Sequence, residues 1–115
     1  MAAFKRGTAD CCAFVDHVIG ELTGNHFLPH YYDDDTAIAI LYEYGSLEGA
    51  VSHYMKAEPV AKDELMPGDV ALVTLMDRQA IGVLMDSGMV AIVFEGQGLR
   101  EIRGDFIDSG WRVWA

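Results

Sequence analysis

The sequence predicts an α+β fold, with N-terminal helices packed on a C-terminal antiparallel sheet. In the first half of the chain, apolar residues recur at helical spacing in segments that glycines end. In the second half, short apolar and β-branched runs alternate with turns that contain glycine and aspartate. Helices followed by short antiparallel strands make an α+β domain. We expect one domain over residues 1–115, with a helical part over about 8–57 and a strand part over about 66–115.

Three helices are expected in the helical part. The first covers about residues 8–22, and Gly24 follows it as a typical helix-ending residue. The second starts at the aspartate cluster 33–35, whose carboxylates suit the positive end of a helix dipole. Ser46 is expected to cap the third, because a serine side chain accepts a hydrogen bond from the first turn.

Five strands are expected in the second part, joined by short turns. They are Val70–Leu75, Ala80–Met85, Met89–Phe94, Leu99–Ile102 and Trp111–Trp114. The last of them alternates as a half-buried strand does. It is a candidate edge strand for pairing with another chain.

Composition narrows the classes of function. Hydrophobic residues make up 51% of the chain, which indicates a packed globule, and the formal net charge is -10. Nucleic acids and anionic membranes bind basic patches, so we expect neither as a partner. No apolar run is long enough to cross a bilayer, and the N-terminus lacks the apolar core of a secretory signal. We therefore expect synthesis in the cytoplasm and reduced thiols.

Cys11 is the leading candidate for chemistry, because it lies near the expected start of the first helix. Partial positive charge and unpaired N–H groups at a helix N-terminus favour a thiolate, which is the nucleophilic form. Cys12 lies about 100° further round the helix and is a weaker candidate.

Three motifs resemble a known family. Asp10-Cys11-Cys12-Ala13-Phe14-Val15 is similar to the Asp-Cys-x-Gly-Phe-Val signature of the NlpC-type cysteine peptidases. Pro67-Gly68-Asp69-Val70 resembles the turn that leads into an apolar strand in that family, and Ala80-Ile81-Gly82-Val83 resembles its His-x-Gly strand. The resemblance covers the chain from about Thr8 to the C-terminus and is closest to short NlpC-related proteins encoded among bacteriophage tail genes. It implies a papain-like fold and an ancestral activity on bacterial cell-wall peptides.

The chain departs from that family at the position of the catalytic histidine. Ala80 stands where the family has its catalytic histidine, and the apolar run 91–93 replaces a polar orienting residue. A cysteine peptidase needs an imidazole to hold the thiolate and to protonate the leaving amine. General acid–base assistance is worth about 10²–10⁴-fold in rate, so its loss leaves little peptidase activity.

His26 and His30 are the candidates for a displaced base, since both lie in the loop after the first helix. Together with the aspartates 33–35 they also suggest a metal site. A loop interrupted by Pro29 does not guarantee convergent ligands, so we interpret this region as a solvated loop followed by an acidic helix start. We expect no metal and no cofactor.

The preferred interpretation is a non-enzymatic structural or assembly protein of a phage tail tip or hub, on a degenerate NlpC-like scaffold. Its partners would be other tail proteins and its location the virion. The first alternative is an active cell-wall cysteine peptidase or amidase that uses Cys11 and a displaced histidine. The second is a small acidic inhibitor of a host protein, a role that the net charge of -10 fits.

Overall fold

The computed structural model describes residues 11–24, 26, 45–75, 78–94 and 98–113, of which 11–13, 78 and 94 are described by their backbone alone. Within these ranges the chain is α+β, with two α-helices and a six-stranded sheet whose pairings are all antiparallel. The predicted α+β class is therefore confirmed. The helix predicted to start at the aspartate cluster 33–35 lies outside the described residues.

Helix α1 spans Cys11–Thr23, so Cys11 is its first described residue. Gly24 ends it with a positive φ of 81°, and its N–H donates to the Gly20 carbonyl at 2.8 Å. The predicted end of this helix is confirmed, because glycine adopts this left-handed conformation without steric cost.

Helix α3 spans Leu47–Met55. The hydroxyl of Ser46 accepts a hydrogen bond from the Gly49 N–H at 3.0 Å, which confirms the predicted cap. At the other end, Lys56 adopts the left-handed conformation with φ 56°, and its N–H bonds back to the last helical turn.

The sheet has the strand order β1-β6-β2-β3-β4-β5. The central part, β2 to β5, is the predicted series of sequential hairpins, and β2 begins and ends where the sequence predicted. The strands are β1 (Val60–Ala61), β2 (Val70–Leu75), β3 (Arg78–Leu84), β4 (Val90–Phe94), β5 (Gly98–Ile102) and β6 (Ile107–Trp111), with short 3₁₀ turns η1 (Lys62–Glu64) and η2 (Gly104–Phe106).

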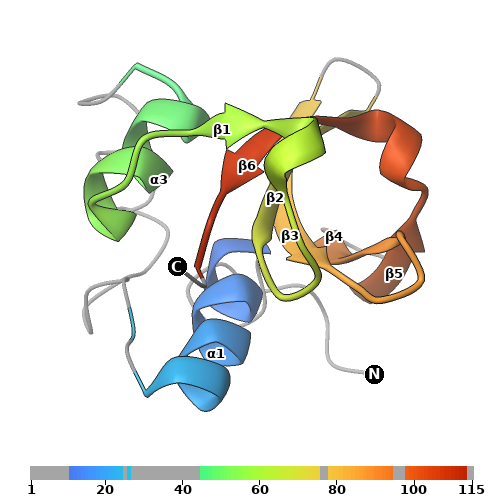
Figure 1. Cartoon of the computed structure of the whole chain (residues 1–115), viewed down its shortest axis with the longest axis horizontal. Coiled ribbons are helices and arrows are strands. Elements are labelled where there is room, and N and C mark those ends of the chain that lie inside the picture. Colours follow the sequence, from blue (N-terminus) through green and yellow to red (C-terminus); the bar gives the residue numbers. More distant parts are fainter. Residues whose placement is uncertain (1–10, 25, 27–44, 76–77, 95–97, 114–115) are drawn as a thin grey trace.

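The terminal strand differs from its prediction. The sequence predicted a strand over 111–114, whereas β6 ends at Trp111. The Val113 N–H donates to the carboxylate of Asp69 at 2.8 Å and does not continue the ladder. β6 also lies between β1 and β2, so it is not an edge strand and does not offer a free backbone to another chain (Figure 1).

Two apolar clusters occupy the two faces of the sheet. On one face the sheet packs against both helices, with α1 below the strands and α3 to their left in Figure 1. We call this set the helix-side cluster: Val15, Ile19, Val51, Val70, Leu72, Ile81, Val83 and Trp111. The far-side cluster lies on the other face: Ala71, Val73, Val90, Ile92 and Ile107, with Leu65, Ala80, Leu84 and Ile102 packed against it.

Candidate functional site

The N-terminal turn of α1 is the site that the sequence singles out. The structure places Cys11 in the first turn of a helix that packs against β3 and β4 (Figure 1). Within the described residues, the first turn of α1 contains no acidic residue. The side chain of Cys11 is outside the described part, so its role as a nucleophile stays a prediction.

The sheet presents an apolar wall to α1. Val15 and Ile19 of the helix are buried against the strands, with exposed fractions of 0% and 5%. The strand residues of the helix-side cluster pack with them. On β3 the wall consists of Ile81 and Val83. Aliphatic side chains hold α1 in place but transfer no protons.

Ala80 lies on the other face of β3. It is half-buried, packs against the far-side cluster and pairs with Val73 across the β2–β3 ladder. Successive side chains of a strand point to opposite faces, so position 80 and position 81 cannot both face α1. A histidine at position 80 would therefore point away from α1. The resemblance assigns the family's histidine position to Ala80, but it does not predict which face of β3 this position occupies.

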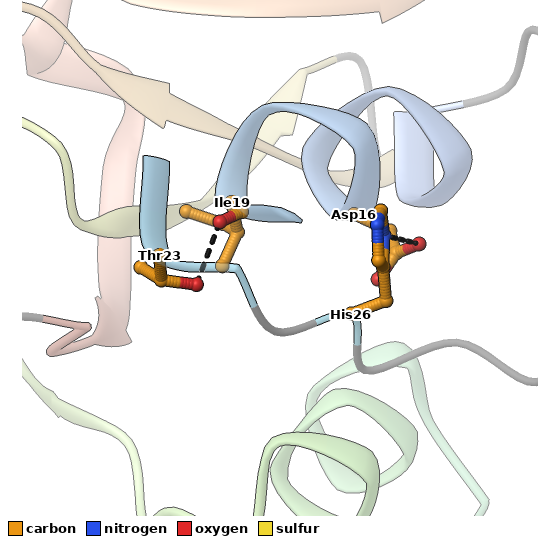
Figure 2. A network of polar contacts seen from close by, with 4 residues as sticks. All are labelled: Asp16, Ile19, Thr23 and His26. Atoms are coloured by element: carbon orange, nitrogen blue, oxygen red, sulfur yellow. Dashed lines mark hydrogen bonds and ion pairs between the residues drawn. The ribbon is translucent and has the colours of Figure 1, made fainter. Parts of the chain in front are cut away.

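His26 is held against the middle of α1. Its Nδ1 lies 3.0 Å from Oδ2 of Asp16, and the side chains of this pair are 58% and 15% exposed respectively. The ring also covers Gly20, where a Cβ would come within 2.1 Å of the His26 Cε1 atom. Figure 2 shows the Asp16–His26 contact and, further along α1, the bond from the Thr23 hydroxyl to the Ile19 carbonyl, which is 2.7 Å long.

This position of His26 is remote from Cys11 along the helix. Asp16 follows Cys11 by five residues, which amounts to about 7.5 Å along the axis and roughly 140° of rotation. Gly20 lies a further turn away. A spacing of four places Cys12, Asp16 and Gly20 along one line of α1, so His26 is on the side of Cys12. The spacing of four residues between Cys12, Asp16 and Gly20 is visible in the sequence. The contact with His26 also depends on the path of the chain after Gly24, which local spacing does not predict.

His30, the aspartates 33–35 and the remainder of that loop lie outside the described residues. Two predictions concern these residues: His30 as a displaced base, and the solvated loop that contains it. Both stay predictions. Within the described ranges, no group of three or more His, Cys, Asp or Glu side chains has the arrangement of a metal site.

Asp69 is the buried charged residue that sequence reasoning did not single out. It is 0% exposed at the start of β2. Its Oδ2 accepts from the Met66 N–H at 2.9 Å and its Oδ1 from the Val113 N–H at 2.8 Å. Buried carboxylates need such partners, so Asp69 has a structural role here. The sequence signal was the Pro67-Gly68-Asp69 motif, which predicted a turn but not the contact with Val113.

The remaining polar contacts on the helix side join α3 and β2 to β6. The Trp111 indole N–H donates to the Ser52 hydroxyl at 2.9 Å, and the Ser109 hydroxyl donates to Glu48 at 3.2 Å. Thr74 donates to Asp108 beside them. In the described part of the chain, no buried side-chain nitrogen or oxygen lacks a hydrogen-bond partner. These groups are engaged in holding the fold together.

The described residues define a small α+β protein with two helices packed on one face of an antiparallel sheet and an apolar interface between them. Residues 1–113 match the model of a family described as a domain of unknown function, DUF6950, and the chain belongs to this family. A search of curated proteins finds no match. Neither of the described helices is long and apolar enough to cross a membrane.

Proposed function

We propose that this protein is a non-enzymatic binding module, a structural or assembly component of a phage tail tip or hub on a degenerate NlpC-like scaffold. The observation that carries the proposal is the apolar interface between α1 and the sheet. Among the described residues, the strand side chains of the helix-side cluster are aliphatic apart from Trp111, whose N–H is already bonded. A thiol at the start of this helix then lacks a group on the sheet to hold or deliver a proton.

Two of the three motifs stand in the structural context that the resemblance implies. The cysteine motif opens a helix that packs on an antiparallel sheet. The Pro67-Gly68-Asp69 turn leads into the buried strand β2. The third motif departs, because Ala80 lies on the far side of β3. This departure supports a scaffold that is not maintained for catalysis.

The experiment is a turnover measurement on the purified full-length protein. Peptides released from peptidoglycan are incubated with the wild-type protein and with Cys11→Ala, and new amines are quantified by mass spectrometry. We expect the two proteins to give the same background, because a thiol without a general acid does not expel an amine leaving group efficiently. Turnover by the wild type that Cys11→Ala abolishes would refute the proposal. An active NlpC-type peptidase in the same buffer serves as the positive control.

A displaced-base peptidase is the second candidate, and one observation favours it. Asp16 holds the His26 ring through Nδ1, and a carboxylate on one ring nitrogen orients the other for proton transfer. If turnover is found, His26→Ala must abolish it, and Asp16→Asn must reduce it while the protein stays folded. Turnover that survives both substitutions would exclude His26 as the base.

The tail assignment rests on the resemblance, and partner identity tests it. The tagged protein, co-expressed with the genes that surround its own, is expected to co-purify with tail structural proteins. Recovery of a single host protein instead would support the alternative of a host-directed inhibitor. The net charge of -10 suits either partner if the contacted surface is basic.

A further inference from the structure

We draw no further inference here: the strongest candidate, the side-chain cluster of Asp16 and His26 over Gly20 on α1, belongs to the site already described, where it supports the displaced-base alternative.

Discussion

The side chain of Asp69 links the turn before β2 to Val113. Its carboxylate accepts the N–H groups of Met66 and Val113, while its own N–H and carbonyl bond to Met66 and Leu84. Gly68 precedes it with φ 95°, a conformation that other residues adopt only with strain. The Pro-Gly-Asp pattern predicts a turn because glycine and aspartate favour one. The long-range bond to Val113 was not predictable from local residue preferences.

Asp69→Ala is expected to lower the free energy of unfolding by about 2–4 kcal/mol, because two backbone N–H groups lose their acceptor. Asp69→Asn retains one acceptor oxygen and should lose about half as much. Urea denaturation provides the measurement. Asp86→Ala, in the exposed turn before β4, is the matched control and should change stability by less than about 0.5 kcal/mol. Equal losses at both positions would contradict the role assigned to Asp69.

At the scale of elements, the alternation of β3 determines which of its side chains face α1. Its alternation sends Ile81 and Val83 toward the helix and Ala80 toward the far-side cluster. The sequence predicted the strand within two residues of its observed start. It did not determine which face the strand turns to the helix, because apolar residues occupy both faces of this strand and give no contrast.

Introducing a histidine at position 80 tests this orientation. Ala80→His should not create peptide turnover and should cost about 1–3 kcal/mol, because the ring overfills the space between β3 and the far-side cluster. The matched variant is Gln79→His at the neighbouring exposed position, which should change stability by less than about 0.5 kcal/mol. Turnover in the Ala80→His protein that requires Cys11 would show that position 80 does reach the thiol.

The strands predicted best are those with continuous β-branched or aliphatic residues, such as β2. The prediction placed the last strand too far along the chain, because the sequence of β6, Ile-Asp-Ser-Gly-Trp, contains aspartate and glycine, which are depleted in strands. Pairing on both sides overrides this low preference, with β1 on one side and β2 on the other. β1 was missed because two residues are too few to form a pattern.

At the scale of the whole molecule, the described helices precede the described strands, as the predicted α+β class requires. The sequence also placed Cys11 in the first helix, which is where α1 has it. It did not place His26, because that contact requires the chain to fold back from Gly24 across Asp16 and Gly20. Such a return depends on tertiary packing rather than on local spacing. The helix that contains the candidate site was thus predictable from the sequence. The side chains that pack around this helix were not.

The pH dependence of Cys11 alkylation tests the central claim most directly. Iodoacetamide rates are measured on the wild type, His26→Ala and His30→Ala between about pH 5 and 10, with Cys11 and Cys12 resolved by mass spectrometry. The account predicts one profile for Cys11 in all three proteins, because no imidazole shares its proton. A fast Cys11 reaction that persists at acidic pH and disappears in either histidine variant would contradict it, since that behaviour identifies a thiolate–imidazolium pair.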